Sequence, residues 1–163
     1  MVSVGDAAPD FTAPLATGDV EQFTLSDSLD DAPIVLAFFP GAFTGTCSHE
    51  LQTFEDRLGE FGELGARVLG ISVDTPFALN AFRDELGLSF DLVSDTNRRL
   101  VEAYDVRTDF ASIGVEDLAK RAVFVVDGDG VVRFAWVSDD PGIEPDYDDV
   151  YDAVASLAET PAK

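Results

Sequence analysis

Ile34–Phe39 reads IVLAFF and is followed at once by Pro40-Gly41, and this stretch decides the fold. An uninterrupted apolar run rich in β-forming residues predicts a strand that is buried on both of its faces. Proline and glycine then end the strand. After the loop, apolar residues recur at the spacing of one helical face, at Leu51, Phe54, Leu58 and Phe61. The stretch therefore predicts a buried strand, a loop and an amphipathic helix, in that order.

The chain downstream predicts further elements of the same kind. Arg67–Val73 (RVLGISV) has the composition of a second buried strand. Thr75-Pro76 predicts the start of a helix, because a capping threonine before a proline is a favoured order, and Gly87 predicts its end. The remaining expected elements are a short strand near 90–93, a helical turn around 98–104, a hairpin of 122–126 and 131–137, and a helix over 147–157.

This order of elements predicts an α/β fold of the thioredoxin-like sandwich type. A central mixed β-sheet is flanked by helices, and residues 1–163 form a single domain. A right-handed crossover places the strands at 34–39 and 67–73 side by side and parallel. Ligands of open α/β sheets bind at the carboxyl ends of the strands. We therefore expect the chemistry of this protein in the loop that follows Ile34–Phe39.

The composition excludes several classes of protein. The chain has 163 residues, with 32 Asp+Glu against 10 Lys+Arg, and a formal net charge of -22 at pH 7. Hydrophobic residues make up 46%, which is too much for a disordered acidic chain. The negative charge repels nucleic acid and anionic membrane surfaces, so neither is expected as a partner. No apolar run approaches the ~20 residues of a membrane span and no signal peptide is recognisable, so we expect a cytoplasmic protein.

The acidic balance has a second implication. Lys120 and Lys163 are the only lysines, and aspartate is more frequent than glutamate. Acidic surfaces with little lysine suit a protein that must stay hydrated in concentrated salt, where its self-repulsion is screened. We therefore predict a halophilic source. The alternative is an ordinary acidic protein of a mesophile.

Cys47 is the only cysteine, and it follows the predicted strand in the stretch Pro40-Gly41-Ala42-Phe43-Thr44-Gly45-Thr46-Cys47. A single cysteine excludes an internal disulfide and a zinc or cluster site. We expect Cys47 in or just before the first turn of the helix, where unpaired N–H groups and the helix dipole favour the thiolate. The alternative is a small buried apolar residue. Thr44 is able to turn its hydroxyl towards the same pocket, or to cap the helix, as is Thr46.

The pattern Pro40-x-x-x-Thr44-x-x-Cys47 after a buried strand resembles the signature of the peroxiredoxins. The resemblance extends along the chain, through Gly5–Phe11, Gly70–Asp74 and Arg121–Asp127. It leans towards the AhpE-like one-cysteine branch, with the bacterioferritin-comigratory type as the nearest relative. The implied activity is the reduction of hydrogen peroxide and organic hydroperoxides without metal, haem, flavin or other cofactor.

The resemblance also implies a role for each matching residue. Cys47 corresponds to the peroxidatic nucleophile, Thr44 to the hydrogen-bond partner of the peroxide, and Pro40 to the residue that shields the pocket from water. Arg121 corresponds to the arginine that orients thiolate and substrate. A fixed guanidinium suits this reaction, because negative charge moves onto the leaving oxygen. The alternative for Arg121 is a structural ion pair with a carboxylate.

Other polar residues near Cys47 are weaker candidates. His49 lies two positions along the helix from Cys47 and is not expected to face it. Glu50 lies three positions away and could orient a group at the site, but we interpret it first as a favourable acid in the first helical turn. Asp74 is expected to cap or turn, and Asp127–Gly130 to form a turn rather than a calcium loop.

The absence of a second cysteine determines the expected cycle. The bacterioferritin-comigratory type often has a cysteine five residues after the first, where this chain has Gln52. An oxidised Cys47 would therefore be reduced by an external thiol, either a low-molecular-weight thiol or a thioredoxin- or glutaredoxin-like protein. A homodimer or higher homo-oligomer is expected from the resemblance. The alternatives are a peroxide sensor or redox-signalling protein that uses the same Cys47, and a catalytically silent interaction module.

Overall fold

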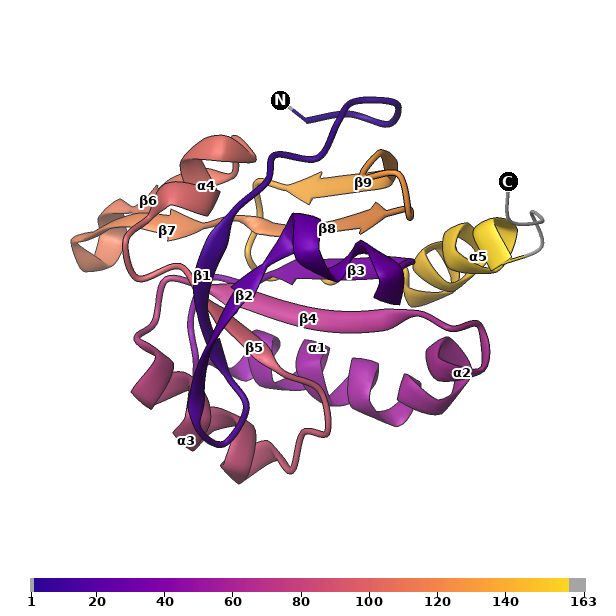
Figure 1. Cartoon of the computed structure of the whole chain (residues 1–163). Helices are drawn as coiled ribbons and strands as arrows, with labels where there is room; N and C mark the ends of the chain where they lie inside the picture. Colours follow the sequence, from indigo (N-terminus) through magenta and orange to yellow (C-terminus); the bar gives the residue numbers. More distant parts are fainter. Residues whose placement is uncertain (1, 159–163) are drawn as a thin grey trace.

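The computed structural model describes residues 2–158, which are built around one mixed seven-stranded sheet (Figure 1). Its strand order is β2-β1-β5-β4-β3-β8-β9. The strands are β1 (Thr12–Ala16), β2 (Val20–Thr24), β3 (Ile34–Phe38), β4 (Arg67–Ser72), β5 (Leu92–Ser94), β8 (Arg121–Val126) and β9 (Val132–Ser138). A separate two-stranded sheet contains β6 (Arg107–Phe110) and β7 (Val115–Ala119).

The helices lie on both faces of the large sheet, as the sequence predicts (Figure 1). They are α1 (Gly45–Asp56), α2 (Leu58–Glu63), α3 (Pro76–Leu86), α4 (Arg99–Ala103) and α5 (Tyr147–Ala158), with 3-10 helices η1 (Leu25–Asp31) and η2 (Ala111–Ile113). One hydrophobic core lies between the sheet and α1, α3 and α5, and the other lies between the sheet and α4 and η1. The α/β sandwich is therefore confirmed.

β3 contributes side chains to both cores. All its residues are buried, with Ile34, Leu36 and Phe38 in one core and Val35 and Ala37 in the other. This alternation follows from the two-residue period of a strand. β3 pairs in parallel with β4 from Ile34↔Arg67 to Phe38↔Ile71, which confirms the predicted crossover. On its other side it pairs antiparallel with β8, the strand that begins with Arg121.

The structure departs from the sequence prediction at three places. The expected continuous helix through Phe61 is broken at Arg57, so α1 and α2 are separate helices. The β1–β2 hairpin and the β6–β7 hairpin were not expected, because none of their strands has a long apolar run and β2, β6 and β7 are partly exposed. Pairing with neighbouring strands, rather than local pattern, determines such strands. No helix within residues 2–158 is long and apolar enough to cross a membrane.

Candidate active site

Cys47 lies in the first turn of α1, directly after the loop that leaves β3. Thr44, in extended conformation, is the residue at which the chain enters the helix. The N–H groups of this turn lack partners within the helix, so they favour negative charge nearby. Only 1% of Cys47 is exposed. The predicted placement at the start of the helix is therefore confirmed, and the thiol is shielded from bulk water.

A cavity of about 200 Å³ lies over Cys47 at the carboxyl end of β3. The four residues that the sequence singled out, Pro40, Thr44, Cys47 and Arg121, all line it. The other lining residues come from the start of α1, from β6 and from the loop after β9, and are Gly45, Thr46, Phe110, Pro141 and Gly142. The last three had no signal in the sequence, because a wall of the cavity can be built from many residue types.

Arg121 connects the thiol to the rest of the cavity and is itself 1% exposed. Its Nη2 lies 3.2 Å from Cys47 Sγ, and its Nη1 donates to Glu50 Oε1 at 2.7 Å. Burial alone would lower the pKa of Arg121, but the neighbouring Glu50 and Cys47 raise it overall. The guanidinium is therefore a fixed cation beside the sulfur. Arg121 thus makes both the contact with the Cys47 sulfur and the ion pair with a carboxylate that was its alternative.

Glu50 is placed differently from the sequence interpretation. It is fully buried, lies beyond the first turn of α1 and forms an ion pair with Arg121, so its interpretation as a favourable acid of the first helical turn is wrong. Burial raises the pKa of Glu50 to about 7, against the opposing influence of Arg121. Its Oε2 has no hydrogen-bond partner among the described residues. The spacing of three residues from Cys47, which puts both side chains on one helical face, was the signal for this position.

His49 contacts Glu144 rather than Cys47. Its Nδ1 lies 2.7 Å from Glu144 Oε1, and its side chain is largely exposed. This agrees with the prediction that two positions along a helix do not face each other. His49 is therefore not a base for the thiol in this structure.

The loop before α1 is held by hydrogen bonds from both sides. Thr44 Oγ1 donates to Gly41 O at 3.0 Å and makes no capping bond to the helix, so side-chain capping by Thr44 is wrong. Asp74 accepts from the N–H of Ala42 at 2.8 Å and from Ser72 Oγ at 2.6 Å. The carboxyl end of β4 thus anchors the loop, which goes beyond the turn or cap expected of Asp74.

The segment Asp127–Gly130 forms the predicted turn between β8 and β9. Asp127 Oδ1 accepts from the N–H groups of Asp129 and Val131, and Gly130 has φ 78. Such a left-handed conformation favours glycine. Among residues 2–158 no group of three or more His, Cys, Asp or Glu is arranged to hold a metal ion.

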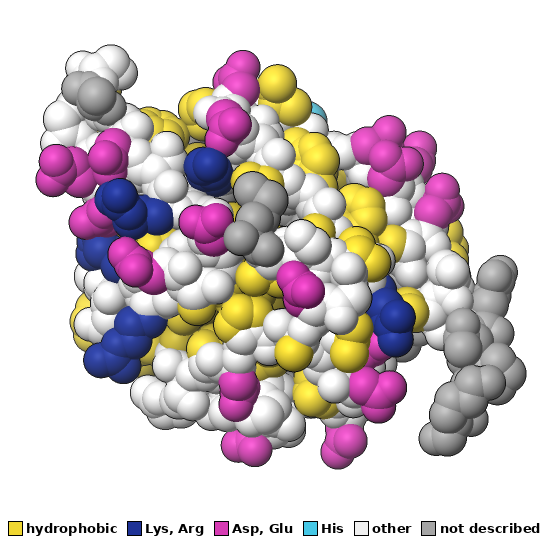
Figure 2. All heavy atoms as spheres, turned by 90° about the horizontal axis from the view of Figure 1, so that it is seen from above, with side chains coloured by type: hydrophobic (Ala, Val, Ile, Leu, Met, Phe, Trp, Pro, Cys, Tyr) yellow, Lys and Arg dark blue, Asp and Glu magenta, His cyan; other side chains and the backbone are white. Residues whose placement is uncertain are grey.

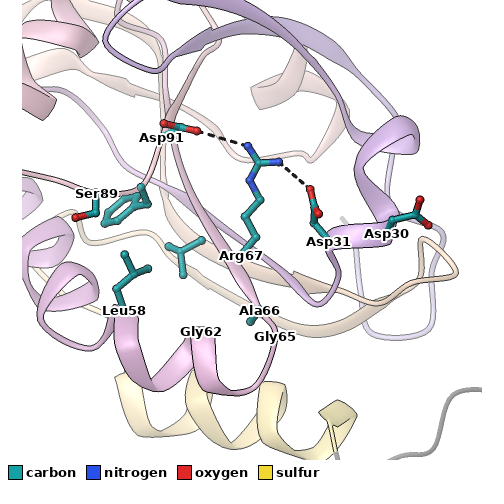
Figure 3. A pocket seen from close by; sticks show the side chains of 11 residues that line it. Asp30, Asp31, Leu58, Gly62, Gly65, Ala66, Arg67, Ser89 and Asp91 are labelled. Carbon is teal, nitrogen blue, oxygen red and sulfur yellow. Dashed lines mark hydrogen bonds and ion pairs between the residues drawn. The ribbon is translucent and has the colours of Figure 1, made fainter.

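A larger cavity of about 620 Å³ lies at the opposite end of the sheet, where β4 begins (Figure 3). Arg67 extends along it between Asp31 and Asp91, at 3.2 and 3.5 Å, so its charge is already paired (Figure 3). Ser89 Oγ donates to Glu55 at 2.8 Å. Pro40, Thr44, Cys47 and Arg121 line the smaller cavity and none of them lines this one.

Comparisons with known proteins find a family model and several relatives that match this chain. Residues 4–135 match the AhpC/TSA family. Alkyl hydroperoxide reductase E of Mycobacterium bovis is 36% identical over 159 residues, which is 96% of this chain and 99% of that protein. The chloroplastic 2-cysteine peroxiredoxin of Chattonella marina var. antiqua is 39% identical over 146 residues, 84% of this chain and 71% of that one. The crystal structure of peroxidoxin BcpB from Mycobacterium tuberculosis has a TM-score of 0.83 at 29% identity, covering 96% of this chain and 99% of its own.

Proposed function

The chain belongs to the AhpC/TSA family and is a thiol-dependent peroxidase of the peroxiredoxin type; on that premise we propose that Cys47 is the peroxidatic residue, with Arg121, Thr44 and Pro40 around it. The observation that carries the proposal is the contact of 3.2 Å between Arg121 Nη2 and Cys47 Sγ inside a shielded cavity. A charged donor at this distance stabilises the thiolate and the charge that develops on the peroxide.

The reaction begins with attack of the Cys47 thiolate on one oxygen of the peroxide. An S–O bond forms and the O–O bond breaks, so that the other oxygen leaves as hydroxide or alkoxide and takes up a proton. Cys47 becomes a sulfenic acid, and the peroxide becomes water or an alcohol. Arg121 stays beside the sulfur and the peroxide. The hydroxyl of Thr44 lies at the cavity wall and donates its proton to Gly41 O, so its oxygen can accept a hydrogen bond from the peroxide. Buried Pro40 keeps water from the reacting atoms.

The reduction of the sulfenic acid requires a thiol from outside the chain, since the sequence has one cysteine. A first thiol forms a mixed disulfide with Cys47 and releases water, and a second thiol restores Cys47 and leaves as a disulfide. We propose a low-molecular-weight thiol or a thioredoxin- or glutaredoxin-like protein as this reductant. We also infer that the protein is cytoplasmic and that its source is a halophile, which the net charge of -22 supports. We further infer that it forms a homo-oligomer, which its family supports.

The test is the rate of oxidation of Cys47 by hydrogen peroxide in a stopped-flow instrument. The unmodified protein is expected to react much faster than free cysteine thiolate, and Cys47→Ser is expected to abolish the reaction. Because serine is nearly isosteric, the free energy of unfolding in urea should stay close to that of the original chain. An oxidation rate of Cys47 no faster than that of free cysteine thiolate would contradict the proposal. Turnover with candidate thiols then separates a peroxidase from a redox sensor.

A further inference from the structure

The loop between β9 and α5, residues 139–146, brings a backbone carbonyl to the active-site arginine. Pro141 O accepts from Arg121 Nε at 3.1 Å and from Arg121 Nη2 at 2.9 Å. Nη2 is the same nitrogen that contacts Cys47 Sγ at 3.2 Å. The guanidinium is planar and rigid, so the position of this carbonyl determines the direction in which Arg121 presents its N–H groups.

The first half of this loop is stiffened by its own hydrogen bonds. Ser138 Oγ donates to Asp140 O at 3.0 Å and accepts from the N–H of Asp140 at 3.1 Å, and Asp140 Oδ1 accepts from the N–H of Gly142 at 2.9 Å. The N–H of Ile143 donates to Asp140 O at 3.1 Å. These bonds make the turn a unit, but they do not fix its position relative to α1, which carries Cys47.

Glu144 supplies the connection to α1. Its Oε1 accepts from His49 Nδ1 at 2.7 Å and from the Tyr147 hydroxyl at 2.5 Å. His49 belongs to the first turns of α1, close to Cys47, and Tyr147 begins α5. Burial alone would raise the pKa of Glu144, but the hydrogen bonds from Tyr147 and His49 outweigh it and hold the pKa below its usual value. Glu144 is thus an ionised acceptor three residues after Pro141.

We propose that His49, Glu144 and Tyr147 form a latch that sets the position of the Pro141 carbonyl, and through it the orientation of Arg121 towards Cys47. These are positioning residues, since none of them touches the sulfur. The inference rests on the proposed function, because it concerns the same reaction of Cys47 with peroxide. His49 is 69% exposed in its side chain, so the latch contributes little to stability. A small displacement at a reacting centre nevertheless has a large effect on rate.

The first experiment compares two substitutions of His49. His49→Leu removes the donor to Glu144, and His49→Asn keeps an N–H donor at a similar place. We expect the second-order rate constant of Cys47 oxidation by hydrogen peroxide to fall about three- to tenfold in His49→Leu and to recover in His49→Asn. Both variants should unfold in urea as the original chain does. Trp136, the only tryptophan, packs against the core that contains Cys47 and serves as the fluorescent reporter.

The matched control is Asp139→Asn, in the same loop. Asp139 pairs with Lys120 at 2.7 Å and is 88% exposed, and its partner lies on neither α1 nor α5. Loss of this ion pair changes the loop charge but leaves the latch in place. The oxidation rate of Asp139→Asn should equal that of the original chain. A fall as large as that in His49→Leu would overturn the proposal, because it would assign the effect to loop charge alone.

A double-mutant cycle separates positioning of Arg121 from a general loosening of the fold. In the Arg121→Ala background no guanidinium is left to orient, so His49→Leu should have no further effect on the rate. If His49→Leu lowered the oxidation rate constant by the same factor in both backgrounds, the latch proposal would be overturned. An unchanged rate constant in the His49→Leu single variant would also overturn it. Failure of the proposed function has a different signature, since the original chain would then itself react no faster than free cysteine thiolate.

Discussion

Arg121 is the residue at which the contacts of the site converge. It reaches Cys47, Glu50 and the Pro141 carbonyl from the first position of β8, although 74 residues separate it from Cys47 in the chain. Burial of an unpaired guanidinium would be costly, and these three partners satisfy it. The contacts that Arg121 makes with the groups of the site therefore also compensate for the burial of its charge.

Replacement of Arg121 by alanine is expected to slow the oxidation of Cys47 by about a hundredfold, because a fixed donor at the reacting atoms is lost. Arg133→Ala is the control, since Arg133 is half exposed on β9 and bonds Asp127 at 2.5 Å, away from the cavity. Unchanged kinetics in Arg121→Ala would remove this residue from the site.

Glu50 makes the stability of the protein dependent on pH. Burial raises the pKa of Glu50 from 4.5 to about 7. In the pH window between these two values, the folded protein keeps a proton that the unfolded chain releases. More protons bound to the folded state means that stability falls as pH rises through the window. The Glu50→Gln side chain resembles the protonated carboxyl. The free energy of unfolding of this variant should therefore match that of the original chain near the lower end of this pH window.

Above the upper end of the window, Glu50→Gln should be more stable than the original chain by on the order of 3 kcal/mol. Urea unfolding of both proteins across this pH range measures the difference, in which the titration of all other carboxylates cancels. If the difference in the free energy of unfolding between the two proteins did not change with pH, the raised pKa of Glu50 would be contradicted.

At the scale of elements, the close packing of side chains against β4 depends on Gly70. A Cβ at this position would lie 2.7 Å from Leu92 Cδ2, 3.2 Å from Phe39 Cε1 and 3.4 Å from Leu51 Cδ2. The space between the helix and the strand is filled by these side chains. Because β4 has no side chain at this point, Leu92 of β5 and Phe39 can lie directly against its backbone, whereas the contact with Leu51 of α1 is an ordinary one.

Gly70→Ala is expected to destabilise the protein by about 1–3 kcal/mol, since an extra methyl group forces side chains or backbone to shift in a packed core. Urea unfolding measures the loss. Gly59→Ala in α2 is the matched control, because a Cβ there meets nothing within 4 Å and alanine favours a helix. Equal stability of Gly70→Ala and the original chain would show that the core can absorb the methyl group.

The elements differ in how far their sequences define them. α3 agrees with its prediction at both ends, since Thr75 accepts from the N–H of Ala78 at 3.3 Å and Gly87 has φ 65. Caps and left-handed glycines are local chemistry, which a sequence displays directly. The break of the helix at Arg57 and the hairpins β1–β2 and β6–β7 depend on neighbours far along the chain, so local pattern did not predict them.

At the scale of the whole molecule, the net charge is -22, and on the face that Figure 2 shows the acidic side chains are scattered rather than gathered in one patch. The buried cation at the cavity, Arg121, is shielded from this surface by its own partners. Hydrogen peroxide is uncharged, so the acidic surface does not repel it.

The free energy of unfolding is expected to rise steeply with KCl, from about 0.1 M to about 3 M, because the Debye length shrinks from about 10 Å to below about 3 Å and surface repulsion is screened. Urea or thermal unfolding at each concentration measures it. Sucrose at matched viscosity is the control, since it does not screen charge. Equal stability at both ends of the range would count against a halophilic source.

The sequence by itself determined the buried strand, the loop and the helix start that carry Cys47, because apolar runs, breakers and helix-start signals act within a few residues. It also indicated Pro40, Thr44 and Arg121 through their resemblance to a family. Only the tertiary structure decided that Glu50 is buried against Arg121, that the Pro141 carbonyl holds the guanidinium, and that Glu144 joins this loop to His49. These contacts join residues distant in the chain, and a backbone carbonyl has no side-chain signature, so packing alone determines them.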